Sequence, residues 1–458
     1  MKKNEEFVLK IEDLSVRGEG VGRHEGMTFF VKDALIGDLA RVGVTKLKKT
    51  YGFARLIEIV EPSPDRVEPV CAFSRPCGGC QLQALSYEKQ LEWKQGLVEN
   101  ALIRIGGFSD LPMEPIIGMA DPFHYRNKAQ FPIGTDRDGQ IITGFYAGRS
   151  HRIVPNRDCA LGVPADRQIL DLVIDWMERC GISAYDEATG EGLLRHVLIR
   201  CGFSTGEILV CLIVNGDGLP HAKELIQALA AVPGMTSISF HRNTRRDNVI
   251  LGEETRVLWG QGFITDTIGG IRFQISPESF YQVNPVQTEV MYRLAAEYAG
   301  LHGTETVWDL YCGIGTISLF LAREAGRVYG VECVPQAVRD ARRNAAENGI
   351  ANVEFFEGKA EEIFPAGDKS GEPTRADVVV LDPPRKGCDP KLLQAILDAQ
   401  PTRVVYVSCN PATVARDARV LCDGGYRLAR VRPVDNFCQT VHTECVLLLT
   451  AEAAERPW

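Results

Sequence analysis

The C-terminal part of the chain alternates short apolar runs with helical segments, and this pattern restricts the possible folds more than any other feature. Each run is four residues long and rich in β-branched or aromatic residues, as is typical of strands buried on both faces. Strands that alternate with helices form a mainly parallel sheet covered on both sides. We therefore expect a doubly wound, Rossmann-like α/β domain. Its predicted strands cover residues 307–310, 328–331, 353–356, 378–381 and 404–407, and its first helices cover residues 317–325 and 337–348, the second ended by Gly349.

Length, charge and cysteine usage limit the class of protein. The chain has 458 residues, too many for one ordinary core, and this predicts roughly two to four domains. The net charge of −9 repels polyanions, so nucleic-acid binding would depend on local basic patches. No apolar run is long enough to span a membrane, and none follows the N-terminus as in a signal peptide. With 14 scattered cysteines, these features favour a reducing, cytoplasmic location in which some thiols bind metal or take part in catalysis.

Residues 1–60 contain several short strand-like segments separated by glycines, which predicts a small OB-type barrel. Its later strands are expected near residues 39–44 and 53–60 and carry a group of basic residues with aromatic residues among them. Such a group can contact phosphates and stack on bases, or it can be a solvated hairpin face. The basic residues are Arg41, Lys46, Lys48, Lys49 and Arg55, and the aromatic residues are Tyr51 and Phe53.

A proline-containing linker at residues 61–64 leads into a β-rich central region that extends to about residue 275. Two stretches there, residues 125–128 and 149–152, combine basic and aromatic side chains. They either bind RNA phosphates or form a solvated strand face. The expected elements are a helix at residues 87–105 with Ser86 as its N-cap, helices near 165–180 and 220–231, and a hairpin of residues 195–203 and 207–214.

The first strand of the α/β domain leads into the sequence DLYCGIGT at residues 309–316, whose glycines allow the backbone to approach a ligand. Glu332 ends the next strand, where an acidic side chain can bind ribose hydroxyls. A plain strand–helix turn has the same pattern, but acids at the ends of both strands favour a ligand site. Since no P-loop is present, S-adenosylmethionine fits better than NAD or ATP.

Asp382 begins the sequence DPPRKG, which follows the fourth predicted strand. Its two prolines fix an extended loop that directs Asp382 toward the same edge of the sheet, although the loop alone could be a rigid turn. Amino-group methyltransferases usually have an aromatic residue where this chain has Arg385, so N-methylation is disfavoured.

Cys409 lies where the last predicted strand meets Pro411, at the edge where open α/β sheets bind ligands. A thiol in this place can be a nucleophile or a small apolar residue that fills a gap. Its sequence position alone favours the second interpretation.

Three further cysteines, Cys71, Cys77 and Cys80, are closely spaced, with two glycines before the last. With a fourth ligand, they suit zinc or a 4Fe–4S cluster, and a Cys-x-x-Cys pair can also be a redox site.

Four sequence motifs, at residues 309–316, 382–387, 408–411 and 442–444, together resemble those of the RNA uracil-C5 methyltransferases. The chain is most similar to the branch that methylates 23S rRNA, which has a TRAM domain and a 4Fe–4S cluster. This resemblance implies a TRAM domain of OB type at residues 1–60, a central domain with the iron–sulfur cluster at 61–275, and a class I methyltransferase domain at 276–458. The helix at 87–105 is expected to pack on the catalytic domain.

The same resemblance implies the roles of individual residues. Cys409 is expected to add to C6 of uracil and Glu444 to remove the C5 proton, after the target base has left its stack. Cys159 matches the fourth cluster ligand, beside Cys71, Cys77 and Cys80. The family usually has proline where this chain has Cys438. The cofactor-binding positions correspond to Gln282, Tyr311, Gly313, Glu332 and Asp382.

The expected activity is therefore S-adenosylmethionine-dependent formation of 5-methyluridine in 23S rRNA, without a membrane or an obligate protein partner. Methylation of tRNA is the nearest alternative, but the tRNA branch generally lacks both the barrel and the cysteine cluster. Cytosine-C5 methyltransferases commonly use two cysteines in Pro-Cys contexts, whereas the partner here is Glu444. An RNA-binding iron–sulfur protein without catalysis would need neither Cys409 nor Glu444.

Overall fold

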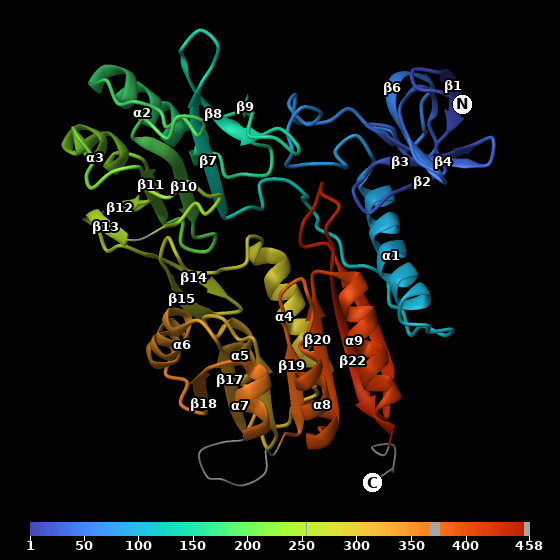
Figure 1. Cartoon of the computed structure of the whole chain (residues 1–458). Coiled ribbons are helices and arrows are strands. Elements are labelled where there is room, and N and C mark those ends of the chain that lie inside the picture. Colours follow the sequence, from blue (N-terminus) through green and yellow to red (C-terminus); the bar gives the residue numbers. More distant parts are fainter. Residues whose placement is uncertain (253, 367–375, 453–458) are drawn as a thin grey trace. The chain divides into compact units, whose positions relative to one another are not determined.

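The computed structural model describes residues 1–252, 254–366 and 376–452 (Figure 1). The chain divides into two compact units. Unit 1 contains Met1–Leu97, Phe145–Val154 and Phe437–His442, and unit 2 contains Val98–Gly144, Pro155–Asn436 and Thr443–Trp458. The division into three domains near residues 60 and 275 stays a prediction. Within the described ranges, no helix has the length and apolar character needed to cross a membrane.

Unit 1 begins with a six-stranded sheet in the order β1-β5-β6-β4-β3-β2. Its apolar side chains, among them Phe29, Val31 and Val42, form a buried core of their own. The predicted β-rich N-terminal region is confirmed, and closure of the sheet into a barrel stays a prediction. The strands are β1 (Glu6–Lys10), β2 (Asp13–Leu14), β3 (Gly20–His24), β4 (Met27–Lys32), β5 (Leu39–Leu47) and β6 (Tyr51–Glu61).

Helix α1 (Tyr87–Arg104) confirms the helix predicted at residues 87–105. Ser86 caps it, since its hydroxyl accepts a hydrogen bond from the Lys89 amide at 3.4 Å. Trp93, in the first half of α1, packs in a core of unit 1, whereas Val98 and Leu102 belong to a core of unit 2.

The central region contains a seven-stranded sheet in the order β13-β12-β11-β10-β7-β8-β9. Antiparallel pairing of β10 with β11 confirms the predicted hairpin. All residues of β11 are buried, in keeping with its unbroken apolar sequence. The elements are β7 (Lys128–Thr135), β8 (Ile141–Tyr146), β9 (Ile153–Pro155), α2 (Ala165–Cys180), β10 (Leu194–Cys201), β11 (Ile208–Val214), α3 (Ala222–Ala230), β12 (Met235–Arg242) and β13 (Glu254–Gly260). A two-stranded sheet, β14 (Ile264–Ile268) and β15 (Ile271–Ile275), follows.

The C-terminal region of unit 2 contains a seven-stranded sheet in the order β18-β17-β16-β19-β20-β22-β21. Helices cover both faces, because successive strand residues such as Val307 and Trp308 belong to two different apolar cores. The predicted α/β domain is confirmed (Figure 1). The elements are α4 (Pro285–Ala299), β16 (Thr306–Leu310), α5 (Thr316–Leu321), β17 (Arg327–Glu332), α6 (Pro335–Glu347), β18 (Val353–Glu357), α7 (Ala360–Ala366), β19 (Val378–Leu381), α8 (Pro390–Ala399), β20 (Arg403–Ser408), α9 (Pro411–Asp423), β21 (Tyr426–Val434) and β22 (Glu444–Ala451).

One predicted helix is shorter than expected. α5 ends at Leu321, whereas its sequence pattern predicts a helix to residue 325. The chain must turn there to start β17 at Arg327, and Gly326 lies so close to Thr304 that a Cβ would be 2.8 Å from the Thr304 carbonyl carbon. Residues 322–326 form the turn into β17 and so are not part of the helix.

The order and direction of the strands place several chain segments at one edge of this sheet. Strands β16, β17, β19 and β20 are parallel, so their carboxyl ends share that edge. β22 pairs antiparallel with β20, with Ser408 opposite Cys445, so β22 begins where β20 ends. Ligands bind at this edge in open α/β sheets.

Candidate active site

Cys409 lies directly after β20 and before α9, in a short turn fixed by capping hydrogen bonds. The Asn410 side chain accepts a hydrogen bond from the Ala412 amide at 3.1 Å, and Pro411 occupies the first turn of the helix. The Asn410 amide donates to the Ser408 hydroxyl at 3.1 Å. The turn holds the half-buried thiol at the edge of the sheet.

Glu444 is the first residue of β22, and its side chain is buried. The pairing of Ser408 with Cys445 brings Glu444 beside the end of β20. Burial raises the pKa of the Glu444 carboxyl well above its usual value, and the charge of Asp382 adds to this effect. The charge of Arg385 opposes it. Glu444 is therefore a desolvated carboxyl group and not a carboxylate exposed at a strand edge.

The thiol of Cys409 shares this environment. Burial raises its pKa to about 11, with smaller contributions from the negative charges of Glu444 and Asp382. Arg385 lowers the pKa through its positive charge and a hydrogen bond. Of the contributions to this shift, Arg385 is the one cation that favours the thiolate over the thiol.

Asp382 follows β19, and its amide donates to the carbonyl of Leu310 at the end of β16, at 3.4 Å. Burial raises the pKa of the Asp382 carboxyl to about 7, with a further contribution from Asp309. The DPPRKG loop thus brings both a carboxyl group and the Arg385 guanidinium to the Cys409 edge.

The loop after β16 has the backbone geometry of a ligand-binding turn. Tyr311 has φ +74° and Gly313 has φ +57°. A Cβ on Gly313 would meet no described atom within 4 Å, so the loop faces open space there. Glu332 orients this loop by accepting hydrogen bonds from the Gly313 amide at 3.1 Å and the Val334 amide at 2.8 Å.

Asp309, at the end of β16, is fully buried and accepts a hydrogen bond from the Ser318 hydroxyl at 2.5 Å. Burial raises its pKa to about 7, with a contribution from Glu332. Its Oδ1 atom has no hydrogen-bond partner within the described part of the chain. Burial raises the pKa of Tyr292, with smaller contributions from the charges of Asp382, Asp309 and Glu444, so all three carboxyl groups act on this one phenol.

These carboxyl groups and glycines fit a cationic nucleoside. S-adenosylmethionine carries a sulfonium charge and two ribose hydroxyls, and desolvated carboxyl groups favour such a cation over another anion. Tyr311, Gly313, Glu332 and Asp382 come together at this edge as the sequence predicts, and their binding roles stay predictions.

Gln282 lies on the segment between β15 and α4, and two polar residues of the central region hold this segment. The Asn127 side chain donates to the Gln282 carbonyl at 2.8 Å, and its backbone amide donates to the Val283 carbonyl at 2.9 Å. The buried guanidinium of Arg200 donates to the carbonyls of Ser279 and, at 3.2 Å, Pro277. The sequence does not reveal these contacts, because they join distant segments.

The contacts of Asn127 change the interpretation of residues 125–128. Tyr125 and Asn127 are buried, so neither side chain can stack on or bind RNA at the surface. This part of the predicted basic and aromatic stretch supports the Gln282 segment.

The three closely spaced cysteines lie on one loop of unit 1. Gln83 joins two of them, since its Oε1 accepts from the Cys71 amide at 3.1 Å and its Nε2 donates to the Cys80 sulfur at 3.2 Å. The Gly79 amide donates to the Cys77 sulfur at 3.4 Å. Burial raises the pKa of Cys77, and the nearby Cys71 adds to this. Cys159 belongs to unit 2.

An aromatic cluster lies among the basic residues of the N-terminal sheet. The ring centroid of Tyr51 lies 5.8 Å from that of Phe30 and 5.7 Å from that of Phe53. Tyr51 is exposed, while Arg41 is paired with Glu58 at 2.5 Å. The exposed ring provides a stacking surface, and Arg41 already has an acidic partner in Glu58.

Comparison with known proteins shows the family of the chain. The sequence model of tRNA (uracil-5-)-methyltransferases matches residues 86–452, and that of the TRAM domain matches residues 2–57. The chain belongs to the tRNA (uracil-5-)-methyltransferase family. It is an RNA methyltransferase with an N-terminal TRAM domain.

Several relatives and one solved structure match nearly the whole chain. An uncharacterized RNA methyltransferase of Halalkalibacterium halodurans is 51% identical over 98% of both chains, and one of Clostridium tetani is 45% identical over 98% of this chain and 97% of its own. The crystal structure of Pyrococcus abyssi tRNA (uracil-54, C5)-methyltransferase with S-adenosyl-L-homocysteine has a TM-score of 0.77 and 28% identity, covering 97% of this chain and 100% of that one. The likeness extends beyond the catalytic sheet.

The pKa of Cys409 predicts how its reactivity changes with pH. Between pH 7 and 9 the fraction of thiolate, and with it the rate of alkylation by iodoacetamide, should rise about tenfold per pH unit. Arg385→Gln should slow this reaction about tenfold, because the thiolate loses its neighbouring cation. Mass spectrometry of the Cys409 peptide measures both rates. Lys386→Gln removes a neighbouring exposed cation and should leave the rate unchanged, whereas a rate independent of pH in the parent would contradict the assignment.

Proposed function

We propose that this protein methylates C5 of a uridine in 23S rRNA, using S-adenosylmethionine and a covalent adduct between Cys409 and C6. The observation that carries this proposal is the placement of Cys409 and Glu444 at one edge by the antiparallel pairing of β22 with β20. Asp382 and the Glu332–Gly313 contact lie at the same edge, where Gln282 and Tyr311 are also proposed to bind the cofactor.

Cys409 is proposed to supply the nucleophile that uracil requires. C5 of uracil is a poor nucleophile, and attack of the thiolate on C6 moves the electron pair of the C5–C6 double bond toward O4. The resulting enolate makes C5 nucleophilic. S-adenosylmethionine, when bound, supplies an electrophilic methyl group for C5.

Glu444 is proposed to complete the reaction as the base. After methylation, C5 carries both the methyl group and a proton, and the carboxylate removes that proton. The electron pair of the C5–H bond re-forms the double bond to C6, and the C6–S bond breaks to release the Cys409 thiolate. A carboxylate with a raised pKa is a stronger base than an exposed one, which suits this step.

Arg385 is proposed to stabilise the anionic forms of this site. Its charge lowers the pKa of both Cys409 and Glu444, so it favours the thiolate before attack and the carboxylate before proton removal. Asp382 opposes both ionisations, which a bound sulfonium cation would offset.

The choice of 23S rRNA rests on the cysteine loop of unit 1, since the rRNA branch that this sequence resembles has a 4Fe–4S cluster. The TRAM domain with its exposed Tyr51 ring suits stacking on an RNA base. It does not separate rRNA from tRNA, because a tRNA methyltransferase structure matches 97% of this chain. A uridine of tRNA is the second candidate, because the structurally similar Pyrococcus abyssi enzyme is a tRNA (uracil-54, C5)-methyltransferase.

We also propose that Cys71, Cys77 and Cys80 bind a 4Fe–4S cluster, with Cys159 as the fourth ligand on sequence grounds. The loop of unit 1 suits thiolate ligands, since the Gln83 amide and the Gly79 amide donate to two of the sulfurs. Methyl transfer moves no net electrons, so the cluster would serve structure or RNA positioning and not the reaction.

Substitution of the two proposed catalytic residues should give different results. Cys409→Ala should abolish transfer of labelled methyl to unmodified rRNA, whereas Glu444→Gln should accumulate an RNA–protein adduct that survives denaturing electrophoresis. Cys422→Ala, a half-buried thiol on α9, is the matched control and should keep full activity. Methyl transfer by Cys409→Ala at the parent rate would end the nucleophile assignment, and free RNA throughout the Glu444→Gln reaction would count against Glu444 as the base.

The substrate is tested by direct competition. With labelled S-adenosylmethionine and equal amounts of unmodified 23S rRNA and bulk tRNA, the label should enter 23S rRNA. Mapping of 5-methyluridine in rRNA from cells with and without the gene should show one or more sites that depend on it. Label confined to tRNA would favour the second candidate while leaving the catalytic assignment intact.

The metal content of anaerobically purified protein tests the cluster. About four iron and four sulfide ions per chain are expected for a 4Fe–4S cluster. Cys77→Ser should lose most of the iron, while Cys180→Ser, which changes a thiol of unit 2 outside the proposed ligand set, should keep it. Zinc without iron or sulfide would contradict the assignment.

A further inference from the structure

Asp417 is a fully buried acidic residue on α9 that belongs to neither the proposed catalytic pair nor the proposed cofactor contacts. Its Oδ2 atom accepts hydrogen bonds from the Cys388 amide at 2.9 Å and the Tyr406 hydroxyl at 2.7 Å. Its Oδ1 atom accepts from Arg416 Nε at 2.8 Å. A buried carboxylate is stable only with such partners. Asp417 therefore holds the three groups that donate to it in place.

The groups around Asp417 hold the main chain of the DPPRKG loop and its continuation. The Arg416 guanidinium, paired with Asp417 at 2.7 Å, donates to the Lys386 carbonyl at 3.1 Å. Gly387 has φ +79°, and a Cβ there would lie 2.6 Å from Asp417 Oδ2. The loop therefore packs on the carboxylate with no room for a side chain at that position.

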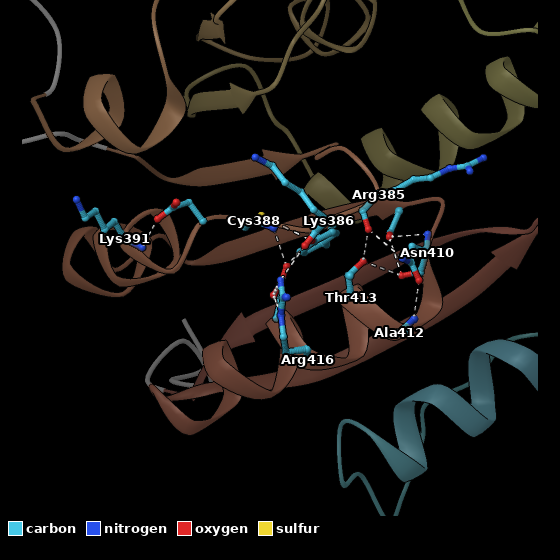
Figure 2. A network of polar contacts seen from close by, with 12 residues as sticks. Arg385, Lys386, Cys388, Lys391, Asn410, Ala412, Thr413 and Arg416 are labelled. Atoms are coloured by element: carbon cyan, nitrogen blue, oxygen red, sulfur yellow. Dashed lines mark hydrogen bonds and ion pairs between the residues drawn. The ribbon is translucent and has the colours of Figure 1, made fainter. Parts of the chain in front are cut away.

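The start of α9 makes a second set of contacts with the same loop (Figure 2). The Asn410 side chain donates to the Arg385 carbonyl at 2.9 Å, and the Thr413 hydroxyl approaches the same carbonyl at 3.4 Å. Three backbone groups of the loop, those of Arg385, Lys386 and Cys388, are thus held by side chains of α9 or its N-cap.

Tyr406 links this network to the strand that ends at Cys409. It lies on β20, and its hydroxyl also accepts a hydrogen bond from the Cys388 thiol at 3.5 Å. Burial raises the pKa of Tyr406, and Cys388 and Asp417 add to this. The phenol therefore stays protonated and donates a hydrogen bond to Asp417. One carboxylate therefore joins β20, α9 and the loop that carries Arg385.

We propose that Asp417 is a positioning residue that fixes the main chain of residues 385–388 and so places the Arg385 guanidinium beside the Cys409 thiol. This inference rests on the proposed function for its catalytic meaning, but the placement itself is independent of the RNA substrate. Without Asp417, Arg416 loses its ion pair and the Cys388 amide its acceptor, while Asn410 and Thr413 still contact the Arg385 carbonyl. The main chain after Arg385 is then less tightly held, and the guanidinium is placed less precisely beside Cys409.

The test compares isosteric variants of full-length protein by alkylation of Cys409 at pH 8. Asp417→Asn should slow the reaction about three- to tenfold, because a displaced Arg385 stabilises the thiolate less. Asp423→Asn, which changes an exposed ion pair at the other end of α9, should leave the rate unchanged. The same Asp417 variant should lower the rate of adduct formation with rRNA while the KM for S-adenosylmethionine changes less than about twofold.

A second readout separates positioning from a general loss of structure. Cys445 is fully buried beside the site, and loosening of the whole domain would speed its alkylation. Positioning predicts the opposite pattern, in which Cys409 becomes slower while Cys445 stays protected. Cys409 alkylation at the parent rate in a folded Asp417→Asn protein, or faster alkylation of both thiols, would overturn the inference.

Two further variants decide the matter if Asp417→Asn does not fold. Tyr406→Phe removes one donor to Asp417, and Gly387→Ala pushes the loop away from it, so both should slow Cys409 alkylation. Parent rates in both variants would refute the proposal. If alkylation changes as expected but Cys409→Ala still methylates RNA, the positioning role of Asp417 stands and the proposed function fails. If alkylation is unchanged but Cys409→Ala abolishes methylation, the proposed function stands and the positioning role of Asp417 fails.

Discussion

The antiparallel pairing of β22 with β20 is the interaction on which the site depends. A parallel sheet brings only carboxyl ends to its ligand-binding edge, so residues at the amino end of a strand are normally excluded from it. Because β22 runs in the opposite direction, Glu444 reaches that edge at the start of its strand, and the pairing of Ser408 with Cys445 sets it beside Cys409. A shift of one residue would turn Glu444 to the other face of the sheet.

Desolvation then determines the chemistry of this edge. Burial raises the pKa values of Asp309, Asp382 and Glu444, so in the free protein these carboxyl groups share one poorly hydrated region. Such a region favours a cation, and Arg385 is the cation that the chain itself brings to Cys409 and Glu444. A bound sulfonium would add a second positive charge, so cofactor binding and ionisation of the thiol and carboxyl group favour each other.

The sequence predicts the sheet and the residues at the carboxyl ends of its strands, because both depend on local patterns. Short runs rich in β-branched or aromatic residues define β16, β17, β18, β19 and β20, and the motifs that end three of them bring Glu332, Asp382 and Cys409 to one edge. The supporting contacts escaped prediction because they join distant segments. Asn127 holds Gln282 across 155 positions, and Asp417 receives the Cys388 amide across 29 positions. The sequence also does not reveal that Tyr125 is buried, because its burial depends on packing against segments that no local pattern identifies.

The catalytic edge does not by itself select the RNA. In the proposed reaction, attack at C6, methylation at C5 and removal of the proton are the same for uracil in rRNA and in tRNA, so the proposed roles of Cys409 and Glu444 do not distinguish the two. With a net charge of −9, the chain as a whole repels both molecules, and affinity must come from local contacts with phosphates and bases. The exposed Tyr51 ring in the TRAM domain is a proposed contact surface of this kind, and it lies in unit 1, whereas Cys409 and Glu444 lie in unit 2. The proposed function therefore assigns RNA contact and chemistry to different parts of the chain.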